Sequence, residues 1–236
     1  MFFGQRQLPK ELNEKQNMKR LTTLFALFLC ISSYAQGQVV YPAKQPQKAV
    51  TQFIIPFEND ETRTGLTPYT LKNSETVTTT DGTTYTVNNL RYKGWDEESG
   101  DYNVIEIKSG STTLLSLNYD DGFEYFFCEN QNLANSHKSF YQIDMGMGYT
   151  ALVFTGVAMS GEPPFVTVVV LKDNTATLAY NNRYYLEDIL QNGNATTLKM
   201  RMNTIEYDAD DKPSEEPIIR YLTMKKGKIY MSMAKP

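Results

Sequence analysis

Residue types that build most metal and redox sites are scarce in this chain of 236 residues. It has one histidine, two cysteines and one tryptophan. Because His137 is the single histidine, zinc sites that need a pair of histidines are excluded, and two cysteines exclude a disulfide framework. The Gly-x-Ser-x-Gly, His-Glu-x-x-His, Cys-x-x-Cys and phosphate-loop motifs are absent as well. We therefore expect no cofactor, no nucleotide chemistry and no metalloprotease chemistry.

Long apolar runs are also rare, and the most pronounced one lies near the N-terminus. A basic start at 18–20 precedes the apolar segment 21–31, and the small residues Ser33 and Ala35 follow it. This three-part pattern is that of a secretory signal peptide cleaved after Ala35. The apolar run is shorter than the roughly 20 residues that cross a bilayer, so we expect no transmembrane span.

The pattern divides the N-terminal region into three predicted segments. We expect residues 1–17 to be a mis-called translation start, 18–35 to be the signal peptide, and 36–52 to be a flexible leader rich in Gln, Pro and Lys. The rest of the chain, 53–236, is then a single β-rich domain.

Cys30 allows an alternative processing of the signal segment, because a lipoprotein signal also ends in a cysteine that becomes acylated. The preceding residue, Leu29, is larger than that processing prefers, so ordinary cleavage is favoured and lipid anchoring at Cys30 is the minority alternative. Cleavage would leave Cys128 unpaired in an oxidising compartment. We expect Cys128 to be a small buried apolar residue and the fold to rely on its core alone.

The charge of the expected mature protein excludes several partners. Residues 36–236 carry a net charge of −7, without basic clusters. Such an acidic chain is unsuited to nucleic acid or to anionic membranes. In general style it looks like the small exported β-rich proteins of Gram-negative bacteria, so we expect a periplasmic or extracellular location of unknown oligomeric state.

Short runs rich in Thr, Tyr, Val, Ile and Phe, separated by turn dipeptides, indicate an all-β fold. Asp81-Gly82 is the strongest hairpin signal, and a type I′ turn is expected there. Segment 165–171 is apolar at both odd and even positions apart from Thr167, which predicts a central strand covered on both faces. Further turns are expected at Ser99-Gly100, Ser109-Gly110, Asp121-Gly122, Asp173-Asn174, Asn192-Gly193 and Lys226-Gly227.

Two architectures fit this pattern: a curled meander of lipocalin-like barrel shape, or a two-sheet β-sandwich. One segment is ambiguous, because apolar residues four apart near 183–191 fit a short helix as well as a strand. A change of apolar phase predicts a β-bulge or bend near Asn203-Thr204.

Aromatic residues provide the leading binding hypothesis. Trp95 lies beside Asp96 and between Tyr92 and Tyr102, close to a predicted turn. Aromatic faces stack on sugar rings, while carboxylates and amides bind hydroxyl groups. These four residues are the candidate carbohydrate-binding surface, although the favoured explanation for Trp95 is that it is a core anchor.

Catalytic hypotheses are weaker. Ser136 and Ser139 flank His137, but adjacency on a loop does not create triad geometry, and we expect His137 to be a solvated surface histidine. Adjacent acidic residues in turns do not form the facing carboxylate pair of a glycoside hydrolase. Non-adjacent acids such as Glu106 and Glu124 keep that reaction open as an alternative.

Paired methionines give a weak copper alternative. Met200-x-Met202 and Met231-x-Met233 would each place two thioethers on one face of a strand, as a Cu(I) site requires. Core packing is the favoured explanation for these side chains.

The sequence therefore predicts an exported, non-catalytic binding module for a carbohydrate or another envelope-associated ligand. One alternative is a lipocalin-like carrier that holds a small apolar ligand near Phe123, Tyr125 and Phe127. The other alternative is a glycoside hydrolase that uses two carboxylates.

Overall fold

All elements of the described chain are β-strands. The computed structural model describes residues 37–43, 52–55, 69–92, 102–125, 137, 139–158, 165–202 and 217–236. The strands in these ranges lie in a single unit, 38–235. They are β1 Gln38–Tyr41, β2 Gln52–Ile55, β3 Tyr69–Thr78, β4 Thr84–Tyr92, β5 Tyr102–Ser109, β6 Thr112–Tyr125, β7 Tyr141–Gly146, β8 Tyr149–Ala158, β9 Phe165–Lys172, β10 Thr175–Arg183, β11 Tyr185–Asn192, β12 Ala195–Met202, β13 Ile218–Lys225 and β14 Lys228–Ser232.

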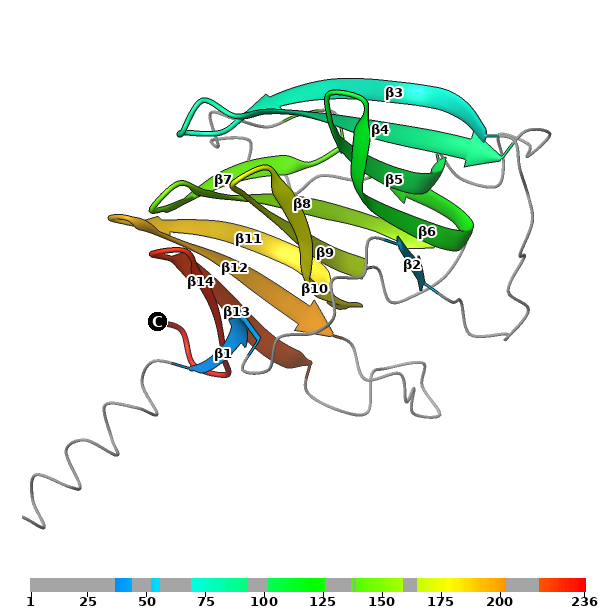
Figure 1. The fold of residues 1–236 in the computed structure, drawn as a ribbon. Helices are drawn as coiled ribbons and strands as arrows, with labels where there is room; N and C mark the ends of the chain where they lie inside the picture. Colours follow the sequence, from blue (N-terminus) through cyan, green and yellow to red (C-terminus); the bar gives the residue numbers. More distant parts are fainter. Residues whose placement is uncertain are drawn as a thin grey trace, which may run out of the picture. The chain divides into compact units, whose positions relative to one another are not determined.

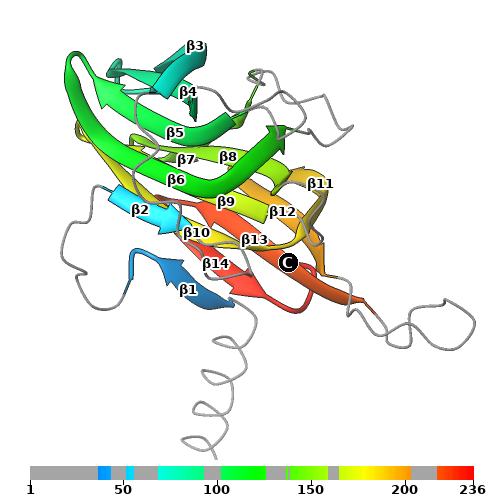
Figure 2. The ribbon, with the colours of Figure 1, turned by 90° about the vertical axis from the view of Figure 1, so that its right-hand side faces the viewer.

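The described strands pair into two open sheets (Figures 1 and 2). The first has the order β1-β14-β13-β12-β11, and the second has the order β10-β9-β8-β6-β5-β4-β3. β7 pairs with β8, and β2 is a parallel partner of β6. Among these strands neither sheet closes on itself, so the all-β prediction is confirmed in its sandwich and meander form, and the barrel alternative is not the one observed.

Two apolar cores share the strands β8 and β9. Alternate side chains of a strand point to opposite faces, so one strand can contribute to both. Leu152 and Phe154 of β8 pack into the first core, against residues of β3 to β6. Ala151 and Val153 pack into the second core, against residues of β11 to β14. β8 and β9, in the middle layer, are therefore covered on both faces, whereas β7 contributes to the second core alone (Figure 1).

β9 shows why the sequence selects this arrangement. The predicted two-sided strand 165–171 is confirmed, because all seven of these residues are buried. Its β-branched side chains suit a pleated surface that is packed on both sides.

Five of the predicted hairpin turns occur, although the first has a different type; they are those at Asp81-Gly82, Ser109-Gly110, Asp173-Asn174, Asn192-Gly193 and Lys226-Gly227. Gly82 is left-handed at φ +84°, whereas Asp81 is not, and Gly82 N donates to Thr79 O. This geometry is a type I turn followed by a left-handed glycine, so the type I′ prediction was wrong. Two successive left-handed residues, as type I′ requires, occur instead at Asp173-Asn174 and at Lys226-Gly227.

Strand pairing differs from the sequence-based expectation at three other places. The ambiguous segment is the strand β11, which pairs with β12, so its four-residue spacing does not make a helix. The predicted turn at Asp121-Gly122 lies inside β6, which continues from its partner β5 to pair with β8. Segment 36–52 contains β1, an edge strand paired with β14, although the sequence predicts a flexible leader there.

Several predictions fall outside the described residues: the signal peptide with Cys30, the turn at Ser99-Gly100, Cys128, and the bend at Asn203-Thr204. Within the ranges that are described, no helix has the length and apolar character needed to span a membrane.

Candidate functional site

The inward faces of β3 and β4 change from apolar to polar at the same end. On β4 the buried residues run from Tyr85 and Val87 to Asn89 and Arg91, and on β3 the inward side chains run from Val77 to Glu75 and Asn73. Because Asn73 pairs with Asn89 in the hairpin register, the two polar ends coincide. The layer beneath must therefore supply polar partners at this end. Those partners are His137 and Ser139, from the segment that leads into β7, and Gln142 of β7 itself.

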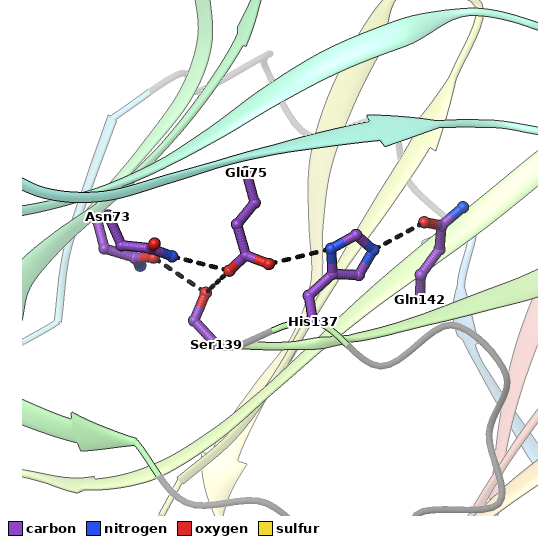
Figure 3. A network of polar contacts seen from close by, with 6 residues as sticks. Asn73, Glu75, His137, Ser139 and Gln142 are labelled. Carbon is purple, nitrogen blue, oxygen red and sulfur yellow. Dashed lines mark hydrogen bonds and ion pairs between the residues drawn. The ribbon is translucent and has the colours of Figure 1, made fainter.

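His137 occupies a defined position between two strands. Its Nδ1 lies 3.1 Å from Glu75 Oε2, and its Nε2 lies 3.2 Å from Gln142 Oε1 (Figure 3). The ring stacks on Phe140 with a centroid separation of 4.3 Å. Only 21 % of the side chain is exposed, so the prediction of a solvated surface histidine was wrong.

Glu75 is the acceptor at the centre of this network. Asn73 Nδ2 donates to its Oε1 at 2.8 Å, and Ser139 Oγ lies 3.3 Å from the same oxygen (Figure 3). Ser139 Oγ is also 2.9 Å from Asn89 Oδ1, and its one proton serves a single acceptor. Exchanging the amide oxygen and nitrogen of Asn89 would let Nδ2 donate to Ser139 and leave the hydroxyl proton for Glu75.

The same three residue types as in a serine hydrolase meet here, but in the wrong order. A triad requires the histidine between the serine and the acid, so that the imidazole removes the serine proton. Here the carboxylate of Glu75 lies between Ser139 and His137, and Nε2 of the histidine faces Gln142. Ser139 is also fully buried. The arrangement holds β3 and β4 against the start of β7 and does not activate a nucleophile.

A groove of about 650 Å³ opens where three hairpins end, beside β7. Its walls come from β7 and from the turns that follow β7, β11 and β13. Met147, at the tip of the first turn, is 72 % exposed and adds apolar surface. The polar lining residues are Gln142, Asp144, Gln191, Asn194, Thr196 and Lys226.

This lining offers hydrogen-bond donors and acceptors together. Three amides and a hydroxyl can each donate and accept, while Asp144 accepts and Lys226 donates. Among the described lining residues there is no histidine or cysteine, and there is one carboxylate, that of Asp144. The described lining therefore supplies no pair of carboxylates for glycoside hydrolysis, but it does supply groups that can bind a polar ligand.

Gln142 belongs to both features. Its Oε1 faces His137, and its Nε2 donates to Thr78 O at 2.9 Å. Gln142 is also one of the residues that line the groove. The histidine network and the groove are thus joined through one residue.

The predicted carbohydrate-binding residues lie mostly beyond what can be described. Trp95 and Asp96 fall outside the described residues, while Tyr92 is the last residue of β4 and Tyr102 is the first of β5. That surface remains a prediction. Of the glycoside hydrolase candidates, Glu106 lies on the outward face of β5, where Asn88 and Thr113 donate to its carboxylate.

The methionines of the copper alternative have different environments. Met200 is completely buried in the second core, and Met202 and Met231 pack against that core. Met233 is exposed. Core packing accounts for three of the four, and the copper alternative stays a prediction. Among the described residues, no group of three or more His, Cys, Asp and Glu side chains is placed to hold a metal ion.

One carboxylate outside the groove has an altered acidity. Partial burial would raise the pKa of the Glu187 carboxyl, but hydrogen bonds from Lys199 and Arg201 outweigh this effect, so its pKa is lowered. The distances are 2.7 Å to Lys199 Nζ and 2.6 Å to Arg201 Nε. This ion pair stabilises the β11–β12 hairpin and is not part of the groove.

Sequence reasoning missed the histidine network for a definable reason. The strand period and the Asp81-Gly82 hairpin place Glu75 on the same face as Val77, which is an available signal of a buried carboxylate. Its partner His137 lies 62 residues further along the chain, and no local pattern connects the two.

Comparison of the chain with protein-family models, with curated proteins and with solved structures finds no match.

Proposed function

We propose that this protein is an exported, non-catalytic binding module whose groove at the hairpin ends binds a carbohydrate. The observation that carries the proposal is the groove itself. Its volume of about 650 Å³ is in the range of small-ligand sites. Hydroxyl groups of a sugar both donate and accept hydrogen bonds, as do the amides and the hydroxyl of the lining. Export is supported by the signal-like pattern at 18–35.

The interior of the fold gives less support to an apolar carrier. The inward side chains of the described strands pack against one another in the two cores. The groove lining carries polar and apolar surface in similar amounts. Its polar groups would lose their hydration against an apolar ligand without compensation. The groove therefore favours a polar ligand.

Binding to a glycan array tests the proposal, using the protein that begins at Gln36. We expect selective retention of one glycan class, and a loss of about tenfold in affinity for the double variant Gln191→Ala/Asn194→Ala. That loss corresponds to two hydrogen bonds that each contribute somewhat under 1 kcal/mol. Both side chains are exposed at the groove, so their removal should leave the fold intact.

The matched control is Asn182→Ala, which removes an exposed amide of β10 that does not line the groove. It should bind as the unmodified protein does. Trp95→Ala separates the groove from the aromatic surface predicted from the sequence. Lost binding in Trp95→Ala with full binding in the double variant would move the site to Trp95. Absence of binding to any glycan would reject the carbohydrate proposal.

A further inference from the structure

Both ring nitrogens of His137 face hydrogen-bond acceptors. Nδ1 faces a carboxylate oxygen of Glu75 at 3.1 Å, and Nε2 faces the amide oxygen of Gln142 at 3.2 Å (Figure 3). A neutral imidazole has one N–H and one lone pair, so it can serve only one of these acceptors. The imidazolium ion donates to both.

The orientation of Gln142 is fixed by a second contact. Its Nε2 donates to Thr78 O at 2.9 Å. Exchanging the amide oxygen and nitrogen would place Oε1 against that carbonyl oxygen, and two acceptors would then face each other. Oε1 therefore has to point at the histidine, and the acceptor character of this side of the ring is determined by the structure.

Among the described residues, the groups in contact with the imidazole ring are one carboxylate, one amide and one aromatic ring. Glu75, on β3, supplies the negative charge that faces Nδ1, and its side chain is only 17 % exposed. Gln142, on β7, is neutral, and Phe140 covers one face of the ring. A proton lost from the ring would leave Nε2, because Nδ1–H keeps the stronger charge-assisted bond to the carboxylate.

Loss of that proton has a direct effect on the groove. The lone pair of Nε2 would face the lone pairs of Gln142 Oε1 at hydrogen-bond distance, which is repulsive. Gln142 would have to turn away, and it could not keep its bond to Thr78 O at the same time. Since Gln142 lines the groove, the shape and polarity of this wall would change with it.

We propose that protonation of His137 holds the groove in its binding form through Gln142, so that the protein binds its polar ligand in mildly acidic surroundings and releases it as the pH rises. This regulation rests on the proposed function of the groove. Reciprocity requires that a bound ligand also favours the protonated histidine. Histidine charge normally changes between about pH 5 and 8.

The chain offers an unusually clear test, because His137 is its only histidine. Protein labelled with ¹⁵N is titrated between pH 5 and 8.5, without any ligand. The imidazole ¹⁵N signals report how many ring nitrogens carry a proton. The side-chain amide of Gln142 and the backbone amides of Gly193 and Asn194 report the state of the groove. We expect both ring nitrogens to be protonated at the acidic end, and all these signals to change with one midpoint.

Two variants give the matched comparison. Gln142→Met removes the acceptor and retains the side-chain length, and it should lower the midpoint of the histidine by about 0.7 pH unit, a fivefold change in proton affinity, as expected for one lost hydrogen bond. Gln191→Met alters another amide of the same groove that does not contact the ring, and it should leave the midpoint unchanged.

The proposal is overturned if Gln142, Gly193 and Asn194 keep their signals while His137 titrates, or if both variants have the same midpoint as the unmodified chain. If Gln142→Met does not fold, the titration of the unmodified chain decides alone. Because no ligand is used, these results are independent of the glycan array. Failure of the array with a coupled titration would reject the carbohydrate ligand and retain the switch.

Discussion

At the scale of single residues, Glu187 should make the folded protein less stable as the pH falls. The Lys199 and Arg201 side chains lower the pKa of its carboxyl in the folded state, below the value of 4.5 that applies to an unfolded chain. The stabilisation is therefore fully present above about pH 4.5 and is lost as the pH falls through the lower, folded value.

Glu187→Gln should consequently reduce the free energy of unfolding by about 1 kcal/mol at pH 7, since a partly exposed carboxylate with two cationic partners contributes at the upper end of surface ion pairs. As the pH falls through the lowered pKa of the folded state, the stability of the unmodified protein should approach that of the variant. Urea unfolding over a series of pH values from 7 downwards measures this. A difference that persisted unchanged to the acidic end of the series would show that the hydrogen bonds, and not the charge, stabilise the hairpin.

For Arg91 we predict the opposite effect on stability, because burying its charge costs free energy. Its side chain is 6 % exposed, and its Nε has no hydrogen-bond partner in the structure. Replacing a buried, incompletely paired charge with an apolar residue of similar length is often neutral or stabilising. We expect Arg91→Met to leave the thermal midpoint unchanged or to raise it.

The comparison for this prediction is Arg201→Met, which removes a hydrogen bond to Glu187 and a contact with the ring of Tyr185. It should lower the midpoint by several degrees. A drop of similar size in Arg91→Met would contradict the interpretation, and it would mean that the guanidinium has a partner that stabilises the folded chain.

At the scale of elements, the hairpin turns test how local geometry and packing combine. Gly193 and Gly227 are both left-handed, at φ +56° and +67°. A Cβ added to Gly193 would meet nothing within 4 Å, whereas one added to Gly227 would lie 2.5 Å from the ring of Tyr149. The backbone cost is common to both positions, and the steric cost belongs to Gly227 alone.

Gly193→Ala should therefore cost about 1 kcal/mol from the left-handed backbone. Gly227→Ala should cost about 1–3 kcal/mol more, because the aromatic ring has to move in a packed region. Thermal or urea unfolding of the two variants gives the difference. Equal losses would show that Tyr149 moves aside freely.

The strands and turns also show which structural features can be predicted from the sequence and which cannot. Turn dipeptides and strand alternation are local, so they predicted most hairpins and the two-sided burial of β9. They were wrong where pairing at long range decides. Asp121-Gly122 has turn character, but pairing of the end of β6 with β8 continues the strand through it. In β11, the four-residue spacing is overruled by pairing with β12. For the same reason the His137–Glu75 contact and the groove, which combine distant hairpins, could not be predicted.

At the scale of the whole unit 38–235, the sharing of β8 and β9 by two cores predicts that the cores unfold together. Phe154 of β8 packs into the first core, and its neighbour Val153 packs into the second. Loss of one core would expose one face of strands whose other face still packs, which leaves an incompletely covered layer. Two independent transitions would be expected only if each core had its own strands.

Phe154→Ala and Leu198→Ala place one cavity in each core, and each should reduce the free energy of unfolding by about 2–5 kcal/mol. Hydrogen exchange of backbone amides in β4 and in β13 then reports on the first and second core separately. With coupled cores, the slowest amides of both strands lose the same protection in either variant. If Phe154→Ala accelerated exchange in β4 and left β13 protected, the two cores would be separate cooperative units, because the shared middle layer would then be stable on one face alone.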